Sequence, residues 1–350
     1  YTTVEPAAGS DITQWTEYSG PFTVSTGTVW AACAKAGFGD SFVSSTSFVV
    51  QDVAAAPSFS PAAGSYVTSV SVSPFTATPG ATVHYTVDGS FPTSSSPALA
   101  PGSPIVLDTL QSTVTVRTIT VAPGYFNSPV SSATYSVLER VQTPEVTAGG
   151  TFVSSVTVSM SSATSGASIY YTLDGTTPTM QAALLSGSSV TLSVAGVYQL
   201  RAVAVKDGLY ADSIVSAVET YTVQQPTATP VLSPATGPFV LSGSVAISCA
   251  TPGAAIYYTT VQGETPTSSS TLYTEPIVLD TVDTTMHVSA IAIKSGDLWA
   301  ASSVVSGSYD IQDRVAEVVI SPAGGPVLAT DTVTLSTATG STTIYYTTVE

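Results

Sequence analysis

The sequence predicts an all-β fold, in which β-sandwiches of about 87 residues follow one another in a tandem array. A tyrosine-containing segment recurs at a nearly constant spacing, and short segments alternate between apolar and polar residues. No segment shows a helical apolar stripe of useful length. Alternation with a period of two over four to eight residues indicates strands with one buried face. About seven such strands in a unit of this size are typical of an immunoglobulin- or fibronectin-like sandwich.

The recurring tyrosine segment sets the repeat. It occurs as His84-Tyr85-Thr86, Tyr170-Tyr171-Thr172, Tyr257-Tyr258-Thr259 and Tyr345-Tyr346-Thr347, with Tyr1-Thr2 at the start. Successive copies are 84, 86, 87 and 88 residues apart. A second segment, Pro104-Ile105-Val106-Leu107-Asp108-Thr109, returns unchanged at 276–281. Self-similarity at a fixed period predicts a tandem array.

Each repeat contains one strand that is longer than the others. We expect it over 29–34, 114–121, 200–205 and 288–293. An earlier strand of each repeat alternates between apolar and hydroxyl residues, with Val70 and Val72, Val156 and Val158, Val245 and Ile247, and Val333 and Leu335 facing inward. The sandwiches are therefore expected to bury one face of each of these strands.

Short joints that contain proline divide the chain, at 52–57, 139–144, 224–230 and 312–322. They predict complete repeats over 53–139, 140–224 and 225–312, the second half of a repeat over 1–52, and the first half of another over 313–350. Joints of this composition indicate a semi-rigid string. Half a sandwich exposes an apolar face and open strand edges, so we expect a longer repetitive chain or half-repeats that complete each other between copies. The pentapeptide Tyr346-Thr347-Thr348-Val349-Glu350 repeats residues 1–5.

The composition excludes some classes of function. The chain has 350 residues, a net charge of -16 and only 7 Lys and Arg, so nucleic-acid binding is not expected. No apolar run is long enough to span a bilayer. The many Ser and Thr residues and the scarcity of Lys favour an extracellular or cell-surface location, and the hydroxyls could carry O-linked glycans. The single asparagine, Asn127, lies in Asn-Ser-Pro, which is not an N-glycan acceptor.

One segment resembles a known module. It runs from Thr251-Pro252-Gly253-Ala254 through Tyr257-Tyr258-Thr259 to Thr265-Pro266-Thr267, and Asp-Gly-Ser/Thr-x-Pro-Thr appears at 88–93 and 174–179. These residues resemble the fibronectin-type-III-like domain at the C-terminus of chitobiase and β-hexosaminidase. The resemblance implies a sandwich with an accessory, non-catalytic role. Gln262-Gly263 and Glu5-Pro6 depart from the Asp-Gly pattern.

No residues of the sequence form a convincing catalytic, cofactor or metal site. Asp88-Gly89 and Asp174-Gly175 could donate oxygens to calcium, but Asp-Gly is also a common tight turn and no dense Asp cluster surrounds either pair, so we favour the turn. His84 and His287 lie in different repeats and are interpreted as ordinary strand residues. A glycosidase pair of carboxylates would need a substrate cleft, which sandwiches of this size rarely have. We therefore expect no enzymatic activity and no cofactor.

Aromatic residues recur at the turn after the long strand, each just past a glycine: Phe38, Tyr125, Phe126, Tyr210 and Trp299. If exposed, they could stack on sugar rings. The alternative that we favour is packing at the junction with a neighbouring repeat.

The two cysteines lie in different repeats. Cys249 shares the inward side of its strand with Val245 and Ile247, and Cys33 shares that of the long strand with Val29 and Ala31. We expect two buried thiols that behave as small apolar residues, unless Cys33 has a partner outside these 350 residues.

These observations predict a structural protein, such as an extracellular filament, a flagellar hair or a surface stalk, built from end-to-end repeats. Its expected partners are further copies of itself or flanking repeats, arranged head to tail. The alternatives are a carbohydrate-binding or spacer region of a secreted glycoside hydrolase, which could bind polysaccharide, and an adhesin.

Overall fold

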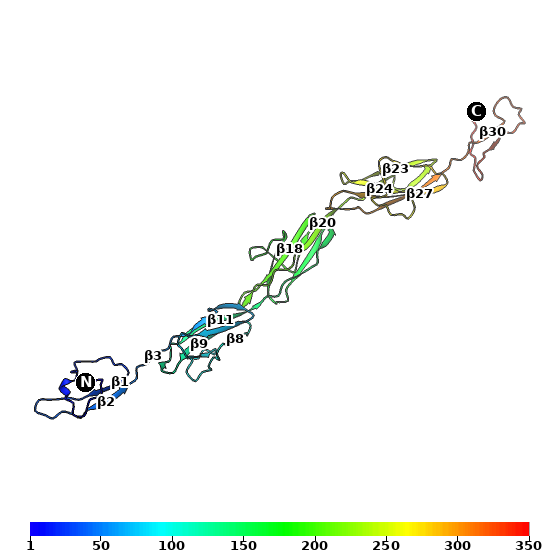
Figure 1. Cartoon of the computed structure of the whole chain (residues 1–350). Coiled ribbons are helices and arrows are strands. Elements are labelled where there is room, and N and C mark those ends of the chain that lie inside the picture. The colour runs from blue at the N-terminus through cyan, green and yellow to red at the C-terminus, as the bar shows by residue number, and fades with distance from the viewer. Residues whose placement is uncertain (350) are drawn as a thin grey trace. The chain divides into compact units, whose positions relative to one another are not determined.

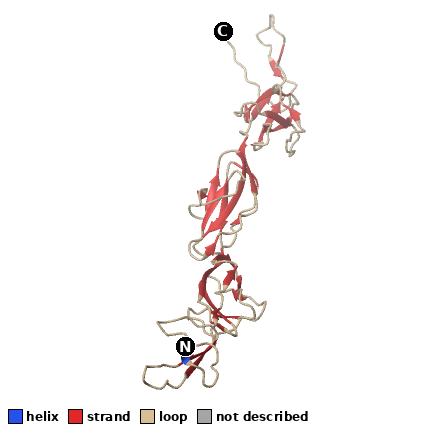
Figure 2. Cartoon of the chain, turned by 60° about the vertical axis from the view of Figure 1, so that its left-hand side comes forward, coloured by secondary structure: helices blue, strands red, loops and turns tan. Residues whose placement is uncertain are grey.

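The computed structural model describes residues 1–349, and its regular secondary structure is almost entirely strand, joined by loops (Figure 2). Within these residues, the only helical element is a 3-10 turn, η1 (Ile12–Gln14), which the side chain of Asp11 caps. Strands such as β6 (Val70–Phe75) and β14 (Val156–Ser161) alternate strictly between buried and exposed residues. The predicted all-β class is therefore confirmed.

The chain divides into two compact units, which are described separately. The first comprises Tyr1–Gln142, Thr164–Ala167 and Ala204–Ile214. Its strands are β1 (Gly27–Ala31), β2 (Ser44–Phe48), β3 (Asp52–Val53), β4 (Ser58–Ser60), β5 (Gly64–Val67), β6, β7 (Thr82–Thr86), β8 (Ile105–Leu107), β9 (Ser112–Val121), β10 (Tyr125–Phe126), β11 (Ser131–Arg140) and β19 (Tyr210–Ala211).

Two sheets form the sandwich of the first unit. One has the order β4-β6-β8, and the other has the order β19-β11-β9-β7 with β5 also paired to β11 (Figure 1). The long strand predicted at 114–121 lies within β9. Between the sheets lies a core of buried residues: Val70, Val72, Ile105, Leu107, Val116, Ala133, Tyr135 and Val137.

The second unit comprises Thr143–Ala163, Ser168–Val203 and Val215–Glu350. Its strands in the repeat predicted over 140–224 are β12 (Glu145–Val146), β13 (Gly150–Val153), β14, β15 (Ser168–Thr172), β16 (Ala183–Leu184), β17 (Ser189–Leu192), β18 (Gly196–Val205) and β20 (Glu219–Pro226). Further along the chain come β21 (Val231–Ser233), β22 (Gly237–Val240), β23 (Gly243–Ser248), β24 (Ala255–Thr259), β25 (Thr271–Leu272), β26 (Ile277–Leu279), β27 (Thr284–Ile293), β28 (Trp299–Ala300), β29 (Val305–Gln312), β30 (Val319–Ser321) and β31 (Thr334–Ser336).

The sheets of the second unit repeat the same pattern twice. The orders β12-β14-β17 and β13-β20-β18-β15-β16 are followed by β21-β23-β26 and β22-β29-β27-β24-β25. In the later sandwich the core contains Leu232, Val245, Ile247, Ile277, Leu279, Val288, Ala290, Tyr309 and Ile311. The last two strands, β30 and β31, form a sheet of two strands. Each sandwich thus pairs a three-stranded sheet with a larger one, as in immunoglobulin-like folds.

Candidate assembly site

The joints are formed by strands that continue from one repeat into the next. In β11, residues 131–137 pair with β9, and the last two residues, Glu139 and Arg140, pair in parallel with Tyr210 and Ala211 of β19. In β20, residues 219–223 pair with β18, whereas Gln225 and Pro226 pair with β28. Asp52 and Val53 of β3 pair in the same way with β10. The backbone of each of these three joints is therefore hydrogen-bonded to the repeat that follows it.

Side chains of the following repeat also form hydrogen bonds with the backbone of the joint. The Ala55 amide donates to Thr78 Oγ1 at 2.8 Å, and its carbonyl accepts from Thr76 Oγ1 at 3.1 Å and from Thr120 Oγ1 at 2.7 Å. We call the two bonds that Ala55 forms with Thr78 and Thr76, which lie just after β6, the joint clamp. It recurs at Ala228, held by Thr251 and Cys249, and at Ala316, held by Thr339 and Thr337. The Gln142 amide donates to Thr164 Oγ1 at the corresponding place.

All the predicted aromatic residues except Phe38 lie beside these joints. Tyr125 and Phe126 form β10, Tyr210 begins β19 and Trp299 begins β28, so their backbones pair with the joint strands. Phe38 is 69% exposed and Phe126 is 59% exposed, whereas Tyr210 and Trp299 are half-buried. Whether these side chains pack at a junction or bind sugar stays a prediction.

All three lysines of the chain contact an aromatic ring at this turn. The Nζ atoms of Lys35, Lys206 and Lys294 lie 4.9, 4.3 and 4.9 Å from the ring centroids of Phe38, Tyr210 and Trp299, respectively. A cation at this distance is attracted to the face of the ring. The aliphatic part of each lysine also covers part of the aromatic surface. The contact of these lysines with the rings was not predicted from the sequence, although Lys206 and Lys294 stand one repeat apart.

In each complete repeat, a buried tyrosine of the larger sheet donates a hydrogen bond to a backbone carbonyl that follows the first strand of the smaller sheet. Tyr135, Tyr221 and Tyr309 are fully buried. The Tyr135 hydroxyl donates to the Pro61 carbonyl at 2.8 Å, that of Tyr309 donates to the Pro234 carbonyl at 2.6 Å, and that of Tyr221 donates to the Thr147 carbonyl. Burial raises the pKa of Tyr221 to about 12, and the nearby Glu219 adds to this shift. Burial likewise raises the pKa values of Tyr135 and Tyr309.

The segment 1–52 has an open apolar face. Its β1–β2 ladder pairs Gly27 with Phe48 and Ala31 with Ser44, as β27 and β29 pair Met286 with Tyr309 and Ala290 with Val305. In the complete repeat Val288, Ala290 and Ala292 are fully buried. Their counterparts Val29, Ala31 and Cys33 are half-buried or exposed.

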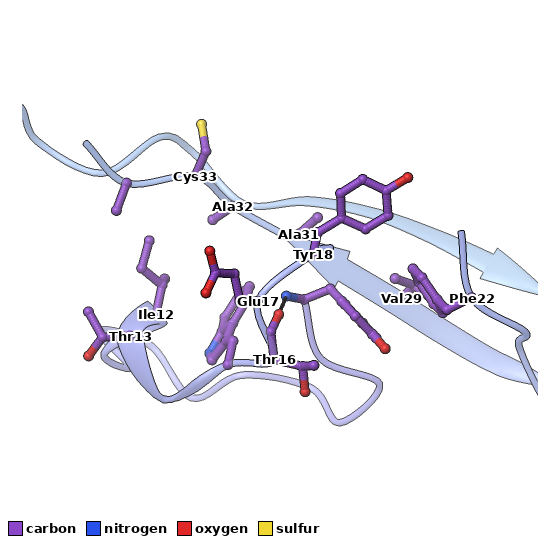
Figure 3. A pocket seen from close by; sticks show the side chains of 13 residues that line it. Ile12, Thr13, Thr16, Glu17, Tyr18, Phe22, Val29, Ala31, Ala32 and Cys33 are labelled. Carbon is purple, nitrogen blue, oxygen red and sulfur yellow. Dashed lines mark hydrogen bonds between the residues drawn. The ribbon is translucent and has the colours of Figure 1, made fainter. Parts of the chain in front are cut away.

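These counterparts line a cavity of about 610 Å³ together with Tyr1, Ile12, Thr13, Trp15, Thr16, Glu17, Tyr18, Phe22, Ala32 and Ala34. Figure 3 shows Ile12 and Thr13 at one end of this cavity and Phe22 and Val29 at the other. The Tyr1 and Phe22 rings stack with their centroids 4.0 Å apart. We call this surface the open face.

The segment 313–349 exposes apolar side chains that the smaller sheet of a complete repeat buries. In the complete repeat, Leu232 and Val245 are 4% and 0% exposed. Their counterparts Ile320 and Val333 are 55% and 61% exposed. The β30–β31 register pairs Ile320 with Leu335, as β21 and β23 pair Leu232 with Ile247. The segment therefore presents strands of the smaller sheet without a larger sheet against them.

The expectation of two buried thiols was wrong for Cys33, which is exposed. Its side of the strand faces the open cavity, and no second sheet covers it within the described residues. Cys249 is half-buried, and its Sγ donates to the Ala228 carbonyl at 3.2 Å, so it replaces a clamp threonine instead of filling the core. Neither cysteine forms a disulfide in the described chain.

Both Asp-Gly pairs form tight turns. Asp88 Oδ1 accepts from the Ser90 amide at 3.0 Å and from Ser90 Oγ at 2.6 Å, and Asp174 accepts in the same way from Thr176. These bonds lower the pKa values of both aspartates. Gly89 and Gly175 have φ angles of 86° and 78°, which a residue with a Cβ rarely adopts. All the bonds recorded for these carboxylates are local, which fits the interpretation as turns.

The histidines bond within their own repeats. His84 Nδ1 lies 2.7 Å from the Ser96 carbonyl oxygen, and His287 Nδ1 lies 3.1 Å from Ser308 Oγ. Among the residues that the structure describes, no three His, Cys, Asp or Glu side chains gather as a metal site would require. In the same part of the chain, no helix is long and apolar enough to cross a membrane.

The repeats match a known family. The model of the chitobiase/beta-hexosaminidase C-terminal domain matches residues 61–132, 147–217 and 234–306. These segments make up more than half of the chain, which therefore belongs to this family and contains the domain as tandem repeats. No curated protein matches the sequence.

Solved structures with similar folds include modular proteins. Fibronectin(III)-like modules of Clostridium thermocellum CbhA are 18% identical, with 49% of this chain and 94% of that chain covered and a TM-score of 0.26. Extracellular domains 3–5 of Drosophila OTK are 8% identical, with 76% and 100% covered and a TM-score of 0.27. The FN1–FN3 domains of chicken CNTN1 are 12% identical, with 74% and 99% covered and a TM-score of 0.25.

Proposed function

We propose that this chain is a structural component of an extracellular filament, flagellar hair or surface stalk, in which the repeats serve as stiff spacers without catalytic activity. The observation that carries the proposal is the double attachment of the joints at 52–57, 139–144 and 224–230, by a backbone ladder and by side-chain hydrogen bonds. A strand such as β20 pairs with one repeat through residues 219–223 and with the next through residues 225–226. The joint clamp then holds the following residues, as Ala228 shows.

This attachment favours a spacer over a flexible tether. Free linkers change direction because their backbone torsions are unconstrained. Here the torsions are fixed by a parallel ladder and by side-chain hydrogen bonds, so bending at a joint would break several bonds together. Flanking repeats, head to tail, would extend the same arrangement, and the hydroxyl-rich surface with few lysines fits an extracellular location.

Small-angle X-ray scattering of the 350-residue chain tests the proposal. Strands of about eight residues are on the order of 25 Å long, so repeats in line should give a maximum dimension above roughly 100 Å. A matched variant, Thr251→Ala with Cys249→Ala, removes both clamp bonds at one joint and should broaden the distribution of interatomic distances. A compact particle for the unmodified chain would contradict the proposal.

A second candidate is binding of polysaccharide by the aromatic turns, favoured by the exposure of Phe38 and Phe126. Exposed rings can stack on the apolar faces of sugars. Affinity electrophoresis on chitin and on cellulose tests it, with Phe38→Ala and Phe126→Ala as matched variants. Unchanged migration of the parent chain in both gels would remove this candidate.

A further inference from the structure

We infer that a pocket on the outer face of the larger sheet, in the repeat over 225–312, binds the guanidinium group of an arginine side chain on a partner protein. The pocket has a volume of about 260 Å³ and lies between β27, β29 and the turn that contains Glu264. The inference concerns a site within one repeat, so it does not depend on the proposed spacer function. Three observations support this ligand.

The first observation is the set of polar groups that line the pocket. They include the carboxylate of Glu264, the ring of His287 and the hydroxyls of Ser289, Ser306 and Ser308. Carboxylate and hydroxyl oxygens accept hydrogen bonds, and a guanidinium has five N–H donors and no acceptor. The volume is smaller than the roughly 300 to 1,000 Å³ of pockets for drug-sized ligands. The pocket therefore suits one side chain that is rich in donors.

The second observation is that another repeat carries an arginine at the floor of this pocket. In the ladder between the tyrosine strand and the long strand, Thr86 pairs with Arg117 in the repeat over 53–139. In the repeat over 225–312, Thr259 pairs with Ser289 at the same step of the ladder. Ser289 is therefore the counterpart of Arg117, with a much shorter side chain on the outer face of the sheet.

Arg117 shows how the fold holds a guanidinium at this place. Its Nη1 donates to the Gly89 carbonyl at 2.6 Å. The turn that contains this carbonyl has the pattern Gly-x-x-Pro-Thr at 89–93, and the same pattern occurs at 263–267. Gly263, the counterpart of Gly89, lines the pocket. The repeat over 225–312 thus has the turn that bonds the guanidinium but lacks the arginine of its own.

The repeat over 140–224 also has an arginine at this position. The buried tyrosine of each repeat pairs with a residue three positions before the arginine, which is Val114 for Arg117 and Tyr198 for Arg201. The two arginines are therefore equivalent. Among the three complete repeats, the exception is Ser289, and the pocket lies where its side chain is short.

The third observation is the negative charge at the pocket. Oε2 of Glu264 accepts from Thr259 Oγ1 at 2.9 Å, and no described residue bonds Oε1. Arginine suits a carboxylate better than lysine does, because its planar fork of donors matches the two oxygens. Residues 225–312 contain one lysine, no arginine and six acidic residues: Glu264, Glu275, Asp280, Asp283, Asp297 and Asp310. The repeat therefore attracts a cation from a partner.

An NMR titration of the 350-residue chain with Nα-acetyl-L-arginine methylamide tests the inference. The chain has only two histidines, His84 and His287, so their ring signals are easily followed. The His287 signals should shift, because its ring lines the pocket, with a dissociation constant on the order of a millimolar for one side chain. The His84 signals, from another repeat, are the internal control and should not shift. The citrulline and lysine analogues should bind about five-fold more weakly or less.

Two pairs of variants locate the site. Ser289→Arg restores the side chain that the other repeats carry and should abolish the shift of His287, whereas Ser289→Ala leaves the pocket open and should keep it. Glu264→Gln removes the charge and should weaken binding about ten-fold. Glu275→Gln is the matched control, because Glu275 is an exposed glutamate of the same repeat outside the pocket, and it should bind as the parent does.

Each other outcome overturns the inference. Unshifted His287 signals at about ten times the expected constant would show that the pocket does not bind a guanidinium. Equal binding of the citrulline analogue would mean that charge does not select the ligand. Equal weakening by Glu264→Gln and Glu275→Gln would place the attraction in the whole repeat, and this pair decides the question even if Ser289→Arg does not fold. An extended scattering profile beside any of these results would leave the proposed spacer function standing.

Discussion

Ala292→Cys should form a disulfide with Cys249 inside one repeat. Ala292 corresponds to Thr120, and Cys249 corresponds to Thr76, two residues whose hydroxyls share the Ala55 carbonyl. Cys249 Sγ already lies 3.2 Å from the equivalent carbonyl of Ala228. Ala292 is fully buried, as is Thr120 at the same place in another repeat, so this position of the fold accepts a side chain larger than alanine.

The size of the stabilisation follows from the loop that the bond closes. Cys249 and position 292 are separated by about 43 residues, and closing a loop of this length restricts the unfolded chain by roughly 4 kcal/mol at 25 °C. Strain in the folded state would reduce this figure. The bond joins the residue directly after β23 of the smaller sheet to the long strand β27 of the larger one, so it connects the two layers.

Equilibrium urea denaturation of the oxidised and reduced variant measures the difference in their free energies of unfolding. Trp299 lies in the same repeat, and its fluorescence should report the transition, with the signals of Trp15 and Trp30 removed by Trp→Phe substitutions. The oxidised form should have the higher midpoint, whereas Ala292→Ser and Cys249→Ser with Ala292→Cys should not respond to reductant. If mass spectrometry found both thiols free after oxidation of the folded variant, the assigned equivalence between the repeats would be wrong.

Three further changes test individual interactions. Tyr221 keeps its proton more firmly when folded than when unfolded, so its contribution to stability is complete below pH 10 and is lost as the pH rises through about 12; the urea midpoint should fall over that range, and less steeply in Tyr221→Phe. Thr118 Oγ1 is buried, and no described residue bonds it, so Thr118→Val should raise the free energy of unfolding by about 1 kcal/mol in urea denaturation, and an unchanged or lower value would show that the hydroxyl is satisfied. Thr251→Ala removes the acceptor of the Ala228 amide and should cost about 1 kcal/mol while speeding hydrogen exchange of that amide; exchange at the parent rate would exclude a role in holding the joint.

Much of the fold could be predicted because burial of alternate residues leaves a direct trace in the sequence. Val70 and Val72, and Val156 and Val158, point inward as their alternation with hydroxyl residues predicts. The long strand was placed correctly at 114–121, 200–205 and 288–293 for the same reason, whereas the prediction over 29–34 was wrong at its end, because β1 stops at Ala31. The tyrosine segment forms strands at 82–86, 168–172 and 255–259, as its period predicts, whereas 345–347 forms no strand.

The assembly site was predicted less completely, because it depends on contacts between residues far apart in sequence. The clamp threonines Thr78, Thr251 and Thr339 recur at the repeat spacing, and that signal could have identified them. Their acceptor role, however, requires the joint to run beside β6 or its equivalent, which only the three-dimensional structure shows. Cys33 was misjudged because alternation predicts which side of a strand a residue occupies, while burial also requires a second sheet on that side.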